Sequence, residues 1–359
     1  MAAGLHVSSP PSPAASREAS AWKARRVLVT GATGLVGGWL VRDLLAKGCD
    51  VVALARDWDP QSELIRSGDV NRVTVVNGVV EDLGTVLRAL NHHGCDTVFH
   101  LAAQTQVGAA WRDPYETFES NVRGSYTVLE ACRRLGEQVR SIVVASSDKA
   151  YGDSNALPYT EATRLDAKFP YDVSKLCTDF LTRSYVVTYG LPATIARCGN
   201  IYGGGDLNWD RIVPGSIRWL LNGERPILRS DGKATRDYVY VKEVVAAYVL
   251  LAENIERPEV RGEAFNFSAG KPLSVLEIVA AVTRVIGSSL APDVRDTAVA
   301  EIRDQYLDAS RAKSVLGWRP TWALDEALAE TVAWYREFLG ASPASGRDPA
   351  KTTPAPARR

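Results

Sequence analysis

The chain has 359 residues, 42 basic against 42 acidic side chains, and a hydrophobic share of 46%. This length fits one large α/β unit or two lobes that share a core, and this hydrophobic share is typical of globular rather than disordered proteins. A net charge of zero, scattered cysteines without a CxxC or His/Cys pattern, and no apolar run of bilayer length predict a cytoplasmic protein with reduced thiols. The same features predict no metal site, no nucleic-acid partner and no membrane partner.

The two ends of the chain differ in composition from its middle. Residues 1–22 and 341–359 are rich in alanine, serine and proline. Such segments bury too little apolar surface to offset the entropy lost on ordering. We therefore expect two disordered tails, no signal peptide, and a folded body over 23–340.

The first half of the body alternates strand-like with helix-like segments. Arg26–Thr30 is a continuous apolar run that ends at a glycine, and apolar residues then recur at helical spacing up to Gly48. Further strand patterns lie at 51–55, 73–76, 97–101, 141–146 and 193–197. Helical patterns lie near 84–92, 115–135 and 170–189. This alternation predicts an α/β fold, a doubly wound parallel sheet of Rossmann type over 23–200.

From Gly203 onward the regular alternation is lost. Helical patterns fall near 212–222, 274–286 and 322–338, and short strand patterns fall near 226–229 and 264–268. We expect 201–340 to form mainly a smaller, mixed α/β lobe that binds the substrate, with some later segments returning to the first domain. A cleft between the two lobes is then the natural ligand site.

A glycine-rich turn follows the first predicted strand and opens the first helix. Gly31, Gly34 and Gly37 have the spacing GxxGxxG, which differs from the GxGxxG fingerprint. Glycines at this junction permit a tight turn and close backbone approach, and the helix N-terminus then faces a pyrophosphate. The turn predicts a dinucleotide site.

The end of the second strand leaves the type of dinucleotide open. Arg56 can pair with a 2′-phosphate, which favours NADP, or cover the adenine, whereas Asp57 can bond the ribose hydroxyls. Both side chains are also compatible with two solvated loop charges.

Tyr171 and Lys175 form a YxxxK pair at the start of a predicted helix. Residues four apart lie on one face of a helix. An ammonium there can lower the pKa of the phenol and hold a ribose, so that the tyrosine can move a proton near neutral pH.

A serine-rich segment ends the fifth predicted strand. Ser147 can hydrogen-bond the same substrate oxygen as Tyr171, and Asp148 and Lys149 follow as an acid/base pair. Catalytic groups of doubly wound folds gather at the carboxyl ends of strands. A salt-bridged turn is the alternative reading of the pair.

In chain order these motifs resemble the extended short-chain dehydrogenase/reductases, and within them the NAD(P)-dependent nucleotide-sugar 4,6-dehydratases. The matching segments run through nearly all of 26–335: TGATGLVG, HLAAQTQV, SNVRGSYTVLEAC, SSDKAYGD, PYDVSK, RCGNIYGGGDLNWDRIVPG and RSDGKATRDYVYVKEV. SSDKAYG and GNIYGGGDLNW are most similar to the CDP-glucose 4,6-dehydratases.

The resemblance implies a reaction in which the cofactor, NAD or NADP, stays tightly bound and is regenerated in every turnover. Tyr171 takes the proton of the sugar C4 hydroxyl while a hydride leaves C4. A base then removes the acidified C5 proton, Asp148 protonates the departing C6 hydroxyl, and the hydride returns to C6. The product is a 4-keto-6-deoxy nucleotide sugar.

Lys149 departs from the Asp-Glu pair of many dehydratases, in which the glutamate is the C5 base. Asp-Lys pairs resemble those of CDP-glucose and some UDP-sugar dehydratases. A desolvated lysine can serve as the C5 base; alternatively Lys149 only orders Asp148, and another group or water removes the C5 proton.

The resemblance also implies the remaining binding residues. The expected cofactor-binding side chains and backbone are Gly31, Thr33, Gly34, Leu35, Val36, Gly37, Arg56, Asp82, Leu101, Ala102, Ala103, Asn121, Tyr171 and Lys175. Asn121 is expected to stabilise the backbone of the site, and Asp82 to compensate for Val79, which stands where relatives often carry an acid. The expected substrate-binding residues are Gln104, Asn200, Arg211 and Arg236.

Two rival functions and an assembly state accompany this interpretation. Nucleotide-sugar 4-epimerases share the glycine turn and the YxxxK pair, but usually carry small or hydroxyl residues in place of Asp148 and Lys149. A non-catalytic nucleotide-sensing relative usually lacks the Tyr or the Lys. In this family, helices such as 115–135 and 171–189 usually form a dimer interface, so we expect a homodimer or homotetramer; packing of their apolar stripes on the sheet is the alternative.

Overall fold

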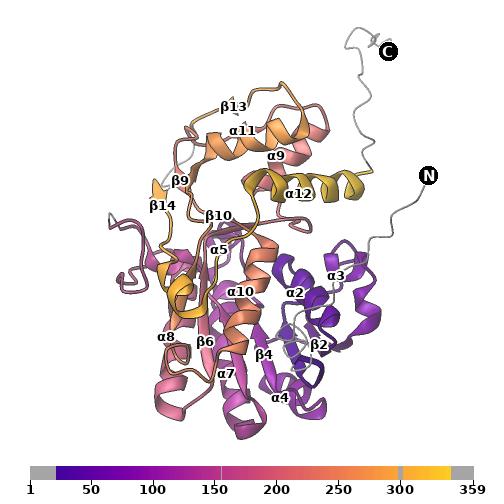
Figure 1. Cartoon of the computed structure of the whole chain (residues 1–359), viewed down its shortest axis with the longest axis vertical. Coiled ribbons are helices and arrows are strands. Elements are labelled where there is room, and N and C mark those ends of the chain that lie inside the picture. Colours follow the sequence, from indigo (N-terminus) through magenta and orange to yellow (C-terminus); the bar gives the residue numbers. More distant parts are fainter. Residues whose placement is uncertain (1–21, 155, 298–301, 341–359) are drawn as a thin grey trace, which may run out of the picture.

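The computed structural model describes residues 22–154, 156–297 and 302–340 (Figure 1). The expected tails at 1–21 and 341–359 lie outside the described residues. Trp22, which we placed in the first tail, instead belongs to the folded body: it is 1% exposed, and its indole nitrogen donates to Glu253 Oε1 at 2.6 Å.

A seven-stranded parallel sheet forms the centre of the molecule, in the order β11-β6-β5-β4-β1-β2-β3 (Figure 1). Its strands are β1 (Arg26–Thr30), β2 (Asp50–Ala55), β3 (Thr74–Asn77), β4 (Thr97–His100), β5 (Ser141–Ala145), β6 (Ala193–Cys198) and β11 (Ala264–Phe267). Every neighbouring pair is parallel, which confirms the predicted doubly wound α/β fold. The carboxyl ends of all seven strands therefore meet at one edge.

Helices cover both faces of this sheet. One face packs against α2 (Leu35–Ala46) and α10 (Val241–Glu253), and the other against α4 (Leu83–His92), α7 (Gly124–Leu135) and α8 (Pro170–Tyr189). Strand residues alternate between the two faces, so that Val27 and Val29 belong to one core and Leu28 to the other. This arrangement explains why the strands read as continuous apolar runs.

One segment departs from the prediction, and another follows it. The helix expected over 115–135 is divided into α6 (Pro114–Phe118), a π-helical turn η2 (Glu119–Arg123) and α7. The strand expected near 264–268 is β11, and it extends the large sheet beside β6, in line with the expectation that some later segments return to the first domain. Helix α10, for which the sequence analysis named no element, precedes it.

The smaller lobe contains α9 (Ile212–Leu221), α11 (Val275–Ile286) and α12 (Leu324–Phe338), which lie together above the sheet in Figure 1. Its strands form three small sheets: β7 (Asn200–Tyr202) with β10 (Tyr238–Tyr240), β8 (Ile227–Leu228) with β13 (Asp293–Val294), and β9 (Thr235–Arg236) between β12 (Leu273–Ser274) and β14 (Asp304–Gln305). The domain boundary near residue 200 remains a prediction.

Short elements complete the chain. They are α3 (Glu63–Arg66), α5 (Val107–Arg112) and the turns η1 (Asp69–Arg72), η3 (Gly136–Gln138), η4 (Asp148–Tyr151) and η5 (Ala312–Leu316). Within the described ranges, no helix is both long and apolar enough to cross a membrane.

Candidate active site

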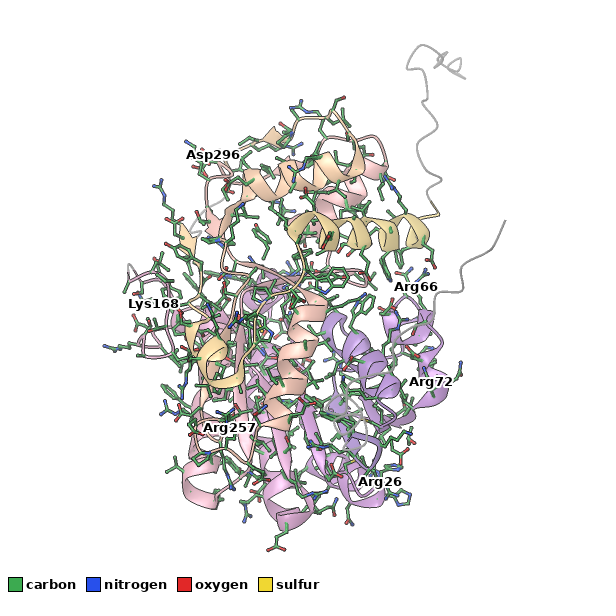
Figure 2. All side chains as sticks on the ribbon, viewed as in Figure 1. Arg26, Arg66, Arg72, Lys168, Arg257 and Asp296 are labelled. Atoms are coloured by element: carbon green, nitrogen blue, oxygen red, sulfur yellow. The ribbon has the colours of Figure 1, made fainter. Side chains whose placement is uncertain are left out.

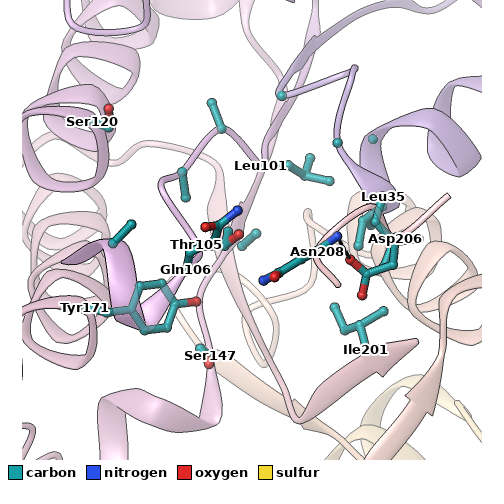
Figure 3. A pocket seen from close by; sticks show the side chains of 18 of the residues that line it. Leu35, Leu101, Thr105, Gln106, Ser120, Ser147, Tyr171, Ile201, Asp206 and Asn208 are labelled. Carbon is teal, nitrogen blue, oxygen red and sulfur yellow. Dashed lines mark hydrogen bonds between the residues drawn. The ribbon is translucent and has the colours of Figure 1, made fainter. Parts of the chain in front are cut away.

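A cleft of about 810 Å³ opens at the carboxyl edge of the large sheet and extends to residues of the smaller lobe. Figure 3 shows it from close by, with Tyr171 and Ser147 on one side and Leu35 and Asp206 on the other. Most of the predicted site residues line it: Gly31, Thr33, Gly34, Leu35, Val36, Gly37, Arg56, Leu101, Ala102, Ala103, Ser147, Asp148, Lys149, Tyr171, Lys175, Asn200 and Arg211.

The glycine turn is built for close backbone approach. Gly31 has φ +72°, and a Cβ added to it would lie 2.8 Å from Ala102 N. A Cβ on Gly37 would lie 2.1 Å from the Gly31 carbonyl oxygen. Helix α2 can therefore pack this closely on the turn after β1 only because residue 37 has no side chain. Gly34 caps α2 without a side-chain hydrogen bond. The N-terminus of α2 is therefore open toward the cleft, and the turn fits a dinucleotide pyrophosphate.

The structure supports some of the residues that we predicted near the adenosine of the dinucleotide and not others. Arg56 lines the cleft, where its guanidinium bonds Asp57 at 2.7 Å and Glu116 at 3.2 Å. Asp57 lines it as well, so both predicted roles remain open. The prediction for Asp82 is not supported, because its carboxylate caps helix α4, accepting from Gly84 N and Thr85 N. Among the described residues, the neighbouring Glu81 lines the cleft and Asp82 does not.

Asn121 acts on the loop that follows β4. Its Oδ1 accepts from Gln104 N at 2.7 Å, and its Nδ2 donates to Gln104 O at 3.0 Å and to Ser174 Oγ at 2.8 Å. The π-helical turn η2 carries this side chain, which ties the loop to helix α8. Gln104 itself donates to Gln106 O, and of the described lining residues Thr105 and Gln106 reach the cleft in its place.

Ser147 and Asp148 lie at the carboxyl end of β5. Asp148 is 3% exposed, and Ser147 Oγ donates to its Oδ1 at 2.9 Å. Burial raises the pKa of the Asp148 carboxyl, although Lys149, Ser147 and Arg236 oppose this shift. A carboxyl group of this kind holds its proton closer to neutral pH than a solvated one, as a general acid requires.

Tyr171 lies on the same side of the cleft as Ser147 (Figure 3). Burial raises the pKa of the phenol to about 12, against the opposing effects of Arg211 and of a hydrogen bond with Ser147. The sequence analysis expected Lys175 to lower this pKa. Lys175 instead donates to Ala145 O at 2.9 Å, and burial lowers its own pKa to about 8. The Arg211 guanidinium lowers the pKa of the phenol, whereas the Asp148 and Asp172 carboxylates raise it.

A buried ion pair supports the floor of the cleft. Asp179 and Arg197 are joined at 3.2 Å and are almost fully buried. Ser146 Oγ donates to Asp179 at 2.7 Å, and Arg197 Nη1 donates to the Tyr151 hydroxyl at 2.8 Å. These contacts fix the end of β5, strand β6 and helix α8, which carries Lys175, relative to one another.

Lys149 lies among polar partners from both lobes. Its Nζ donates to Gln305 Oε1, and Gln305 Nε2 donates to the Asp148 carbonyl oxygen at 3.1 Å. Asp172 is 4% exposed; burial raises its pKa to about 6, with Lys149 opposing and Asp148 reinforcing the shift. Asp148, Lys149 and Asp172 are thus one electrostatic cluster beside Tyr171.

Three of the residues expected to bind substrate separate into two groups. Asn200 and Arg211 line the cleft, and Arg211 is held by Asp206 at 3.0 Å and by Ile201 O at 3.3 Å. Arg236 is buried and donates to the carbonyl oxygens of Thr235, Ile302 and Arg303. It does not belong to the described lining.

The sequence analysis did not single out several residues of this region. Asp206, Asn208, Cys198 and Tyr248 line the cleft. Asp206, Asn208 and Cys198 lie inside the motif RCGNIYGGGDLNWDRIVPG, which begins at Arg197. Treating every side chain of that motif as a candidate would have identified these three. Among the described residues, no group of three or more His, Cys, Asp or Glu side chains is arranged to hold a metal ion.

Comparison with known proteins gives a family and several relatives. The model of the family described as "NAD dependent epimerase/dehydratase family" matches residues 27–267. The chain is 27% identical to a CDP-glucose 4,6-dehydratase of Salmonella typhimurium, over 89% of this chain and 92% of the relative. It is 32% identical to a UDP-glucose 4-epimerase of Mycolicibacterium smegmatis, over 87% of this chain and 98% of the relative.

A solved structure of a dTDP-glucose 4,6-dehydratase from Streptomyces venezuelae, with NAD bound, has the same fold. Its TM-score is 0.78 at 28% identity, over 88% of this chain and 98% of that one. The relatives thus include both dehydratases and an epimerase that act on nucleotide sugars.

Proposed function

Because this chain belongs to the NAD dependent epimerase/dehydratase family, we propose that it is a nucleotide-sugar 4,6-dehydratase with CDP-glucose as its substrate. The observation that carries the proposal is the buried Asp148 beside Tyr171, followed by Lys149. An epimerase expels no water and needs no acid at this position.

The reaction is balanced within one turnover. Oxidation of the C4 hydroxyl to a ketone removes one proton and one hydride from the sugar. Loss of the C5 proton and of the C6 hydroxyl releases water and leaves a C5=C6 double bond. The hydride then adds to C6 and a proton to C5, which gives the 4-keto-6-deoxy sugar. No external oxidant or reductant is consumed.

Tyr171 and Ser147 act at the C4 oxygen in this proposal. Tyr171 takes the hydroxyl proton, and Ser147, which bonds the phenol, orients the same oxygen. Burial works against ionisation of the phenol, whereas the Arg211 guanidinium favours it. Arg211 therefore assists the proton transfer.

Asp148 and Lys149 act at C5 and C6. Asp148 gives its proton to the departing C6 hydroxyl, for which its raised pKa prepares it. Lys149 serves the same step, either as the base that takes the C5 proton or as the group that orients Asp148.

The cofactor of the proposal is a nicotinamide dinucleotide, NAD or NADP, that stays bound between turnovers. When bound, it supplies the two-electron acceptor and donor of the reaction. The open N-terminus of α2 would hold its pyrophosphate, the 101–103 backbone would lie along it, and Lys175 would hold its nicotinamide ribose. Asn200 is proposed to bind the diphosphate of the substrate, and Arg211 its nucleotide side.

A mass-resolved activity assay tests this function. The purified protein is incubated with CDP-glucose, GDP-mannose, UDP-glucose, UDP-GlcNAc or dTDP-glucose without added NAD(P)H, and each is followed by mass spectrometry. We expect CDP-glucose to lose one water. Asp148→Asn and Tyr171→Phe should reduce this rate by about 10²-fold or more. Asp153→Asn, an exposed acid of the same segment, should leave it unchanged.

The alternative function has a distinct signature in the same assay. A 4-epimerase, which the 32% identical relative favours, would convert its substrate without any change of mass. That result would contradict the role of Asp148. Bound NAD or NADP, released by denaturation and identified by mass, distinguishes the two cofactors.

A further inference from the structure

Gln305 joins the two lobes of the molecule at the catalytic turn. It is 0% exposed and lies on β14, a strand of the smaller lobe. Its side-chain oxygen accepts from Lys149 Nζ, and its side-chain nitrogen donates to the Asp148 carbonyl oxygen at 3.1 Å. One amide therefore contacts the side chain of one catalytic residue and the backbone of the other.

The strand pairing places Gln305 next to Arg236, which the sequence analysis expected to bind substrate. Strand β14 runs parallel to β9, and Gln305 is the register partner of Arg236. Arg236 donates to the carbonyl oxygens of Ile302 and Arg303, just before Gln305 in the chain. The strand that carries Gln305 is thus fastened to the strand that carries Arg236.

Gln305 does not itself belong to the described lining of the cleft, whereas Lys149 and Asp148 do. A buried amide that satisfies two groups at once fixes both positions, because leaving either polar group unpaired is costly. Its effect on the reaction must therefore pass through the two catalytic residues.

We propose that Gln305 is a positioning residue that holds Lys149 and the Asp148 backbone in the geometry for water elimination. This inference rests on the proposed dehydratase function. Through Gln305, the smaller lobe contributes to the chemistry as well as to substrate binding. A displacement of about 1 Å at a reacting group can cost about 10² in rate.

Two conservative variants separate the contacts. Gln305→Asn keeps the amide but shortens it by one methylene, so that it cannot reach both partners. Gln305→Glu keeps the length and the oxygen that accepts from Lys149. We expect Gln305→Asn to lower kcat for water loss by about 10²-fold with KM unchanged, and to accumulate reduced nicotinamide, because C4 oxidation precedes the slowed elimination. Gln305→Glu replaces the N–H that donates to the Asp148 carbonyl oxygen with a carboxylate oxygen, so it should also lower kcat, by less than Gln305→Asn does.

A second readout does not depend on activity. Trace acetylation of the folded protein reports the reactivity of Lys149 relative to Lys168, whose side chain is 66% exposed and lies at the edge of the molecule in Figure 2. Labelling of Lys149 should rise in Gln305→Asn and stay at the wild-type level in Gln305→Glu. Asp304→Asn, on the same strand, is the matched control for both measurements.

The outcomes are distinct. Wild-type kcat in either Gln305 variant, or a loss that appears only in KM, would overturn the positioning role. Should Gln305→Asn fail to fold, the kcat and labelling of Gln305→Glu against wild type still decide it. If the wild-type protein removes water from no donor while the labelling follows expectation, the dehydratase function fails and the positioning contact stands.

Discussion

Asp172 is a buried acid within the segment that joins Tyr171 to Lys175. Burial raises its pKa from 3.8 to about 6. Between these two pH values the folded protein therefore holds a proton on this group that the unfolded chain has released. Ionising this buried acid costs free energy in the folded state, so the group destabilises the fold at each pH at which it is charged there. The free energy of unfolding therefore falls as the pH rises from 3.8 to about 6, and the cost is fully present above that range.

Asp172→Asn is expected to remove this cost. The free energy of unfolding should rise by up to about 3 kcal/mol at about pH 7, because one pKa unit is worth about 1.4 kcal/mol, and should change little at about pH 4. Denaturant unfolding at both pH values measures the difference. Asp166→Asn, at a carboxylate that is half exposed, is the control variant. An equal effect of Asp172→Asn at both pH values would contradict the assignment.

At the scale of elements, the crossing of β1 and α2 depends on one glycine. A Cβ at Gly37 would meet the backbone of Gly31 and Ala32 at 2.1 to 2.8 Å, and backbone atoms cannot move aside as a flexible side chain can. Gly37→Ala should push the helix away from the strand, with a cost of about 1–3 kcal/mol and a lower content of bound dinucleotide. Thermal unfolding and the nucleotide released on denaturation measure both effects.

Gly84→Ala is the matched control for this prediction. Gly84 also lies in the first turn of a helix, α4, but a Cβ there would make only ordinary contacts, at 3.5 Å and beyond, with Asp82. Alanine favours a helix by about 1 kcal/mol relative to glycine. Gly84→Ala should therefore leave cofactor content unchanged and stability equal or higher. A similar loss in both variants would rule out the steric explanation.

At the scale of the whole molecule, helices α7 and α8 carry apolar side chains on their outer surface. Tyr126 is 40% exposed, Phe180 52% and Val187 85%. Other residues of the same helices pack on the sheet, as the alternative reading expected, and the dimer interface remains a prediction. We propose that Tyr126, Phe180 and Val187 are buried in a homodimer, because exposed apolar side chains often mark contact sites.

Phe180→Glu combined with Tyr126→Glu is expected to convert the dimer to a monomer, because the interface would have to bury two carboxylates. Light scattering coupled to size exclusion gives the mass. Val294→Glu, in the smaller lobe and 46% exposed, should keep the wild-type mass. A monomeric wild-type protein would remove the proposal.

The linear sequence predicted most of the strands of the large sheet, several of the helices and many of the residues that line the cleft. Parallel strands covered on both faces must be apolar throughout, and helices between them need an apolar stripe, so Arg26–Thr30 and Pro170–Tyr189 were readable from local pattern. Because the strand order brings all carboxyl ends to one edge, the groups that follow β1, β4 and β5 had to meet there, and they do. Gly31, Ser147 and Tyr171 belong to this class.

Tertiary structure decided the contacts that no local pattern encodes. Asp82 follows β3 as a ribose or adenine ligand would, yet its backbone places it at the N-cap of α4. The π-helical turn that aims Asn121 at the 104 loop interrupts a pattern that reads as one helix. Gln305 stands 156 residues from Lys149 in the chain, and their contact exists because β14 pairs with β9. Periodicity reports which face of an element is buried, whereas the partner of a buried polar group depends on how distant segments pack.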